Sequence, residues 1–79
     1  MPASYVLINC DIGSEESVKS QLKEVDLVKE VYGVFGAYDI VVLVEADTVE
    51  SLRDTITWKI RKLEKIRSTL TMMVIKEQG

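Results

Sequence analysis

The spacing of hydrophobic residues changes repeatedly along this chain, and the order of the changes restricts the fold more than any other feature. Strand-like segments, which alternate with a period of two or are rich in β-branched residues, occupy residues 5–12, 28–35, 38–46 and 66–76. Spacing of three and four residues, typical of amphipathic helices, occupies residues 14–25 and 48–64. The order predicts a β-α-β-β-α-β, ferredoxin-like α+β fold, a four-stranded antiparallel sheet with two helices on one face. No linker or repeat interrupts it, so we expect a single domain over residues 1–79.

Polar residues mark where the helices are expected to begin. Ser14, followed by two glutamates, offers a capping hydroxyl and negative charge at the first helix N-terminus. Asp47 or Thr48 is expected to cap the second helix, with Glu50 three residues after Asp47 as in a capping box. The predicted buried face of this helix consists of Val49, Leu52, Ile56, Ile60 and Leu63.

The third predicted strand is apolar at every position from Ile40 to Val44. A strand with one solvated face would alternate apolar and polar residues, so both faces of this strand are predicted to be buried. The helices cover one face only, and we expect a second copy to cover the other in a dimeric α+β barrel. Burying roughly 300 Å² at ~25 cal/mol/Å² is worth about 8 kcal/mol, comparable to the stability of a small domain, so the homodimer would be obligate.

Composition excludes several kinds of chemistry. The chain has no histidine and one cysteine, which rules out an intrachain disulfide, a Cys/His zinc site and a histidine-based catalytic triad. No glycine-rich phosphate loop or carboxylate motif with metal-ligand spacing is present, so we expect no cofactor, no metal and no enzymatic activity. The net charge of −3 argues against direct nucleic-acid binding.

Without a signal sequence or a long apolar run, we expect a cytoplasmic protein that does not enter the membrane.

Two further features are interpreted structurally. Cys10 alternates with Val6, Ile8 and Ile12, which predicts a buried structural thiol. A basic cluster is assigned to the last turns of the second helix, where cations complement the macrodipole, in preference to a phosphate-binding patch. The cluster comprises Lys59, Arg61, Lys62, Lys65 and Arg67.

Trp58 lies off the predicted core stripe of the second helix. Two interpretations stay open for its ring, an interface contact and partial exposure to solvent.

Two segments carry residues suited to ligand binding. The turn Gly36-Ala37-Tyr38-Asp39 places a carboxylate beside an aromatic ring and backbone amides, and Thr69 and Thr71 place two hydroxyls on one strand face. From the residues alone a structural role is favoured for both segments. In that interpretation the glycine supplies an unusual φ, the aspartate hydrogen-bonds the local backbone, and the threonines pack across strands.

The segment Gly36-Ala37-Tyr38-Asp39-Ile40-Val41 and the later segment from Ile66 to Ile75 resemble the Gly-x-aromatic-Asp hairpin and the final strand of a known domain. That domain is the effector-binding (RAM) domain of the Lrp/AsnC transcriptional regulators, and the resemblance extends over essentially the whole chain. It implies a dimer closed through the sheets, further assembly such as a tetramer of dimers, and amino acids bound in clefts between dimers. The residues implied to bind the ligand are Gly36, Ala37, Tyr38, Asp39, Thr69 and Thr71. Within that site Asp39 would accept the ligand ammonium.

Two departures from the family pattern are visible. The helix-turn-helix half of the usual regulators is absent from this sequence, so the chain resembles a free-standing effector domain. Leu63-Glu64-Lys65 stands where members often carry Leu-Pro-Gly.

The resulting hypothesis is a non-catalytic module that senses an amino acid, oligomerises, and modulates full-length Lrp/AsnC relatives by mixed assembly. One alternative is a cofactor-independent enzyme of the dimeric α+β-barrel type, which would need Asp11, Asp39 or Glu45 inside the barrel. Another is an ACT-like regulatory module, which usually pairs sheets edge to edge, whereas the doubly apolar third strand favours face-to-face packing.

Overall fold

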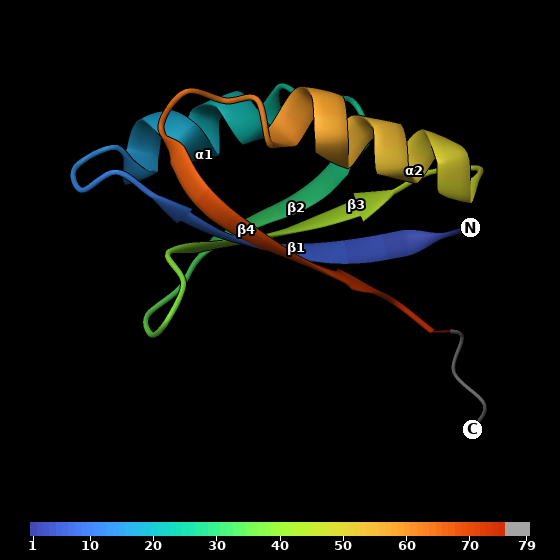
Figure 1. Cartoon of the computed structure of the whole chain (residues 1–79), viewed down its shortest axis with the longest axis horizontal. Helices are drawn as coiled ribbons and strands as arrows, with labels where there is room; N and C mark the ends of the chain where they lie inside the picture. Colours follow the sequence, from blue (N-terminus) through green and yellow to red (C-terminus); the bar gives the residue numbers. More distant parts are fainter. Residues whose placement is uncertain (76–79) are drawn as a thin grey trace.

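The computed structural model describes residues 1–75 and shows one antiparallel sheet with both helices on the same face (Figure 1). The elements are β1 (Ala3–Cys10), α1 (Glu15–Lys23), β2 (Val28–Gly33), β3 (Ile40–Glu45), α2 (Val49–Thr55), a π-helical turn η1 (Ile56–Ile60) and β4 (Ile66–Met73). The strands lie in the order β2-β3-β1-β4, and all neighbours are antiparallel. The predicted ferredoxin-like β-α-β-β-α-β order is therefore confirmed. Lys76, which the expected last strand included, lies outside the described residues.

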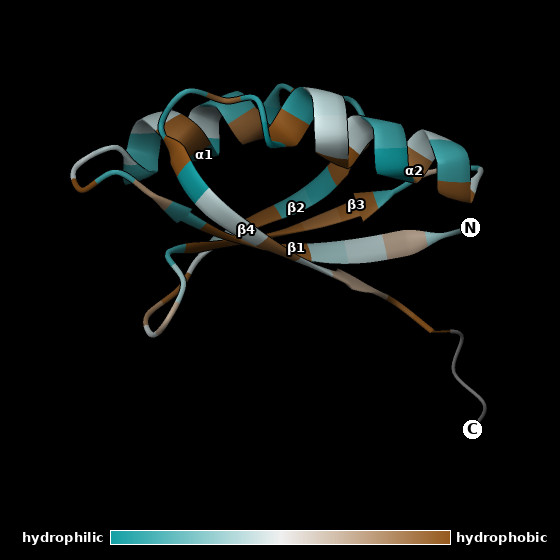
Figure 2. Ribbon diagram, viewed as in Figure 1, coloured by the Kyte–Doolittle hydropathy of each residue, from teal (hydrophilic) through white to brown (hydrophobic). Residues whose placement is uncertain are grey.

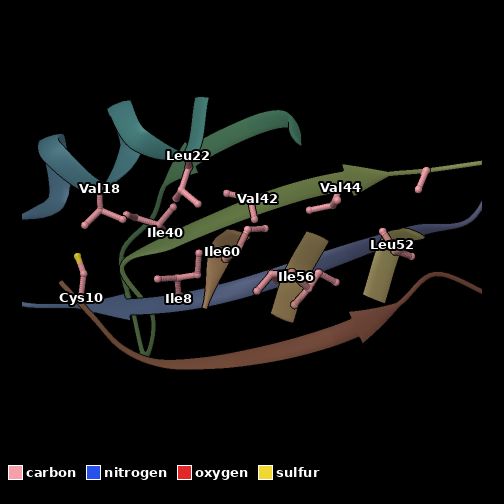
Figure 3. Close-up of a cluster of buried hydrophobic side chains, with 12 residues drawn as sticks. Ile8, Cys10, Val18, Leu22, Ile40, Val42, Val44, Leu52, Ile56 and Ile60 are labelled. Atoms are coloured by element: carbon pink, nitrogen blue, oxygen red, sulfur yellow. The ribbon is translucent and has the colours of Figure 1, made fainter. Parts of the chain in front are cut away.

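The core lies between the helices and one face of the central strands (Figure 3). Alternate residues of β1 and β3 point towards the helices because side chains of a strand alternate between faces. Val18 and Leu22 of α1 and Leu52, Ile56 and Ile60 of the second helix close over them. The strand contribution consists of Val6, Ile8, Cys10, Ile40, Val42 and Val44.

The strands end earlier than the hydrophobic pattern predicted. β1 stops at Cys10, and Ile12, expected in this strand, lies in the following turn and is 94% exposed. Gly13 has a φ of 85°, which turns the chain towards α1 before the alternation can continue. β2 stops at Gly33, so Val34 and Phe35 belong to the hairpin loop and not to the strand. The backbone N–H of Val34 donates to the carbonyl of Asp39 at 3.0 Å and closes that loop.

The helix starts also differ in detail from the prediction. Ser14 occupies the N-cap position of α1, but its side chain makes no capping hydrogen bond. Thr48 caps α2, and its Oγ1 accepts from the backbone N–H of Ser51 at 3.0 Å. Since Asp47 is not the cap, Glu50 does not form the expected capping box.

The second helix changes its hydrogen-bonding pattern halfway and ends at Ile60 rather than near residue 64. In η1 the backbone N–H of Arg61 donates to the carbonyl of Ile56 at 2.9 Å, which is an i→i+5 bond. Ile56 and Ile60, at the two ends of this turn, are both buried, while Val49 is exposed in the first turn of the helix. The basic cluster is thereby divided, since Lys65 lies in the turn after the helix and Arg67 lies in β4.

The sheet face away from the helices is apolar and uncovered in the single chain. β3 is hydrophobic from Ile40 to Val44 (Figure 2), and its alternate residues Val41 and Leu43 point away from the core. They pair across the sheet with Leu7 and Tyr5, which in turn lie opposite Leu70 and Met72 of β4. We call these six residues the open face. The inner face of β3 is buried as predicted, whereas Val41 and Leu43 are half-buried in the single chain, so burial of the outer face stays a prediction.

Core packing predicts the first mutational outcome. Ile60→Ala removes a fully buried side chain, and we expect the free energy of unfolding to fall by about 2–5 kcal/mol. Val49→Ala is the matched control in the same helix, because Val49 is 46% exposed and should cost less than about 1 kcal/mol. Urea denaturation followed by circular dichroism measures both. Equal losses for the two variants would contradict this assignment of the buried face.

Candidate functional site

The loop between β2 and β3 extends to the side of the sheet opposite the helices (Figure 1). Gly36 has a φ of 131°, a conformation that favours glycine over any residue with a Cβ. Gly36 and Ala37 are exposed, while Tyr38 and Asp39 at the base of the loop are half-buried. The backbone of the turn is therefore accessible, and its two larger polar side chains are held against the sheet.

Asp39 connects this loop to β1. Its backbone N–H donates to the carbonyl of Ile8 at 2.9 Å, and its Oδ2 accepts from the backbone N–H of Cys10 at 3.0 Å. The carboxylate thus supplies an acceptor for β1 at the point where β3 has not yet begun. The residues alone favoured a hydrogen bond to the local backbone of the turn, whereas this bond reaches Cys10, 29 positions earlier in the chain. A carboxylate has about four lone-pair sites, so Asp39 keeps capacity for a ligand.

A concavity of about 450 Å³ lies directly beside Asp39. Besides Asp39, its polar lining consists of Asn9, Arg67 and Ser68. The Nδ2 of Asn9 donates to the Oγ of Ser68 at 3.4 Å, which fixes two of these groups relative to one another. A carboxylate, a guanidinium and a hydroxyl within one concavity offer partners for a zwitterion, with the ammonium on Asp39 and the carboxylate on Arg67.

Arg67 and Ser68 were not among the residues that sequence reasoning selected. Arg67 is grouped above with the cations of the second helix, although it falls within the segment predicted as the last strand, and the structure places it in β4. The sequence could have indicated both residues as candidates for the site, because they directly precede Thr69 in the predicted last strand.

The two threonines lie elsewhere in the single chain. Thr69 pairs with Ile8 and Thr71 with Val6, and both of these β1 residues are buried beneath the helices. Residues directly opposite in a sheet share a face, so both threonines point to the helix side of β4. One chain therefore brings Asp39 together with Arg67 and Ser68, but it does not bring either threonine into that concavity.

The tip of the hairpin carries an unpacked aromatic ring. Phe35 is fully exposed and borders a second concavity, of about 290 Å³, on the other side of Asp39. The same concavity is lined by Lys19, whose Nζ lies 2.9 Å from the Glu16 carboxylate. Sequence reasoning had placed Phe35 inside a strand and did not select it as a contact residue.

The thiol of Cys10 is unreactive, although Cys10 lies next to Asp39. It is buried, and that burial, with smaller contributions from the charges of Asp39, Glu15 and Asp11, raises the pKa of its thiol above the ordinary value. The prediction of a buried thiol is confirmed. A neutral thiol is a poor nucleophile at neutral pH. Among residues 1–75, no group of three or more acidic, cysteine or histidine side chains is placed to hold a metal, and no helix could cross a membrane.

The element order and the sheet define a ferredoxin-like α+β domain, and comparison with known proteins names its family. The profile described as "Lrp/AsnC ligand binding domain" matches residues 3–78, and the chain belongs to this family.

Solved structures of similar length agree closely. The hypothetical protein PHS023 from Pyrococcus horikoshii is 41% identical with a TM-score of 0.90, and the alignment covers 99% of this chain and 94% of that one. TTHA0845 from Thermus thermophilus is 33% identical with a TM-score of 0.92, and coverage is 100% and 99%.

Longer proteins match the chain over part of their own length. A feast or famine regulatory protein from M. tuberculosis, solved in complex with L-methionine, shares the fold with a TM-score of 0.80 at 21% identity, and the chain covers 53% of its length. A homocitrate synthase from Saccharolobus solfataricus is 37% identical over 75 residues, which are 94% of this chain but 16% of that enzyme.

The raised pKa of Cys10 predicts a pH dependence of stability. Because the folded-state pKa lies above the unfolded one, the contribution is complete below about pH 8.5 and is lost as the pH rises through the folded-state pKa. We expect the free energy of unfolding to fall more steeply between neutral and alkaline pH in the wild type than in Cys10→Ala, in which the thiol is gone. Urea titrations at a series of pH values measure this. Identical pH slopes for both proteins would contradict the pKa shift.

Proposed function

We propose that this domain is a non-catalytic sensor that binds an amino-acid-like effector beside Asp39 and works as an oligomer built from sheet-to-sheet dimers. The observation that carries the proposal is the concavity where Asp39 and Arg67 lie with Ser68. Its opposite charges match the two ends of an α-amino acid. The regulator solved with L-methionine, which has the same fold, supports this ligand class.

The proposed dimer forms through the open face. Tyr5, Leu70 and Met72 are exposed in the single chain, and Leu7, Val41 and Leu43 are half-buried beside them. A contiguous apolar surface of this kind is rarely left in water by a soluble protein, and a two-fold partner would present the same surface in return.

Assembly beyond the dimer is proposed to complete the effector site. The exposed Phe35 and the accessible Gly36 and Ala37 lie on a loop that extends away from its own helices, so a neighbouring copy can reach them (Figure 1). Tyr38 would line the cleft next to Asp39. Thr69 and Thr71 lie apart from Asp39 within one chain. They would line an effector cleft only if a second copy supplied its β2–β3 loop.

The regulated partner is proposed to be a longer protein carrying the same type of domain. Mixed assembly with full-length Lrp/AsnC regulators is one form of this proposal, and the effector would then alter DNA binding by the partner. The second candidate for the regulated partner is a metabolic enzyme that carries such a domain, which the similar segment of the homocitrate synthase supports.

The arrangement of acids gives the catalytic alternative little support. An enzyme of the α+β-barrel type would direct an acid into an enclosed cavity, whereas Asp11 is exposed and Asp39 lies at a surface concavity. Glu45, the third candidate, is only half-buried at the end of β3.

Ligand binding is testable with substitutions that replace a charged side chain with a neutral polar one. Asp39→Asn and Arg67→Gln each remove one of the two charges, and we expect each to weaken amino-acid binding at least about tenfold. A panel of L-amino acids is first screened by thermal shift, and the best ligand is then titrated by calorimetry. Asp47→Asn, in the exposed β3–α2 loop, is the matched control and should bind like the wild type. Unchanged affinity in both site variants would overturn the proposed site.

The dimer is testable by placing a charge on the open face. Leu43→Asp puts a carboxylate in the centre of the proposed interface, and we expect light scattering to shift from the dimer mass to the monomer mass at micromolar concentration. Val49→Asp is the matched control on the helix side, where a first-turn carboxylate is favourable. A wild-type protein that is monomeric at that concentration would refute the proposal directly.

A further inference from the structure

A groove on the helix side of the sheet combines two arginines with an apolar floor. It has a volume of about 260 Å³ and lies between the second helix and β4. Its apolar lining consists of Val49, Ile56 and Met73. Arg53 and Arg61 supply its charges, and Thr57 and Thr71 supply hydroxyls. It adjoins the part of β4 that pairs with β1 residues 4–6, whereas the hairpin adjoins Ile8 and Ile40 at the other end.

The π turn aligns the two arginines on one side of the helix. Over the eight positions from Arg53 to Arg61, a regular α-helix would place Arg61 about 80° ahead of Arg53. The i→i+5 bond from Arg61 to Ile56 marks a wider turn with less rotation per residue, which brings Arg61 back towards the row of Arg53 and Thr57. Turns of this kind are rare within helices and occur frequently at functional sites.

Neither arginine has an ionic partner in the described part of the chain, where the ion pair present joins Lys19 and Glu16. Both guanidinium groups are thus available, and guanidinium binds carboxylates with two parallel hydrogen bonds. A small concave site with an apolar floor and a few polar groups at its edge is the usual form of a small-molecule site.

We propose that this groove is a second ligand site, separate from the effector site beside Asp39, and that it binds a short-chain carboxylate. The carboxylate pairs with Arg53 and Arg61, and the hydrocarbon chain lies on Ile56 and Met73. Thr71 contributes its hydroxyl here in the single chain.

Hexanoate is the probe, and hexanamide, which has nearly the same shape and no charge, is the matched control ligand. Titration into the ¹⁵N-labelled wild type should shift the amide resonances of Ile56, Thr57, Thr71 and Met73 with millimolar affinity, while hexanamide should bind at least about tenfold more weakly. Equal binding of the two probes, shifts centred on other residues, or no binding at all would overturn the proposal.

Three variants separate this site from the effector site. Arg53→Gln and Arg61→Gln lie on the exposed side of the helix, and each should weaken hexanoate binding at least about tenfold without loss of helical circular dichroism. Arg67→Gln, which removes the arginine beside Asp39, should leave hexanoate affinity unchanged. Loss of binding in Arg67→Gln alone would move hexanoate to the effector site and refute the second site. The outcome does not depend on amino-acid binding, so either proposal can fail while the other stands.

Discussion

The structure depends on β3, whose side chains are apolar on both faces. Ile40, Val42 and Val44 are fully buried under the helices, while Val41 and Leu43 point to the opposite side. A strand of this kind needs an apolar layer against each of its two faces, and the two helices cover only one of them. The open face is therefore the direct consequence of a sheet with helices on one side only, and it explains why an oligomer is the proposed working unit of so short a chain.

Asp39 plays two parts that are compatible with one another. It holds the hairpin against β1 through the N–H of Cys10, and it presents its remaining lone pairs to the concavity shared with Arg67. A residue that is fixed by a backbone hydrogen bond is well suited to bind a ligand, because little of its side-chain freedom is left to lose on binding. The structural and the functional interpretations of this aspartate thus do not exclude each other.

The second helix shows how local geometry follows from the core. Leu52, Ile56 and Ile60 are all buried, and the π turn spans the last two of them. The same turn brings Arg61 towards the row of Arg53, and both arginines line the groove beside β4. One irregularity in hydrogen bonding therefore affects the groove that we propose as a second site.

The sequence alone determined the order of the elements, the helix-side core and the apolar character of the open face, because each follows from side-chain periodicity along one segment. The resemblance of the hairpin to the family pattern also indicated Asp39 as a candidate ligand contact. The tertiary structure decided where strands and helices end, since Gly13, the hairpin bond of Val34 and the π turn respond to packing between distant segments. It also decided that Arg67 and Ser68, and not Thr69 or Thr71, lie beside Asp39 within one chain, because strand register depends on the pairing partner and not on the strand itself.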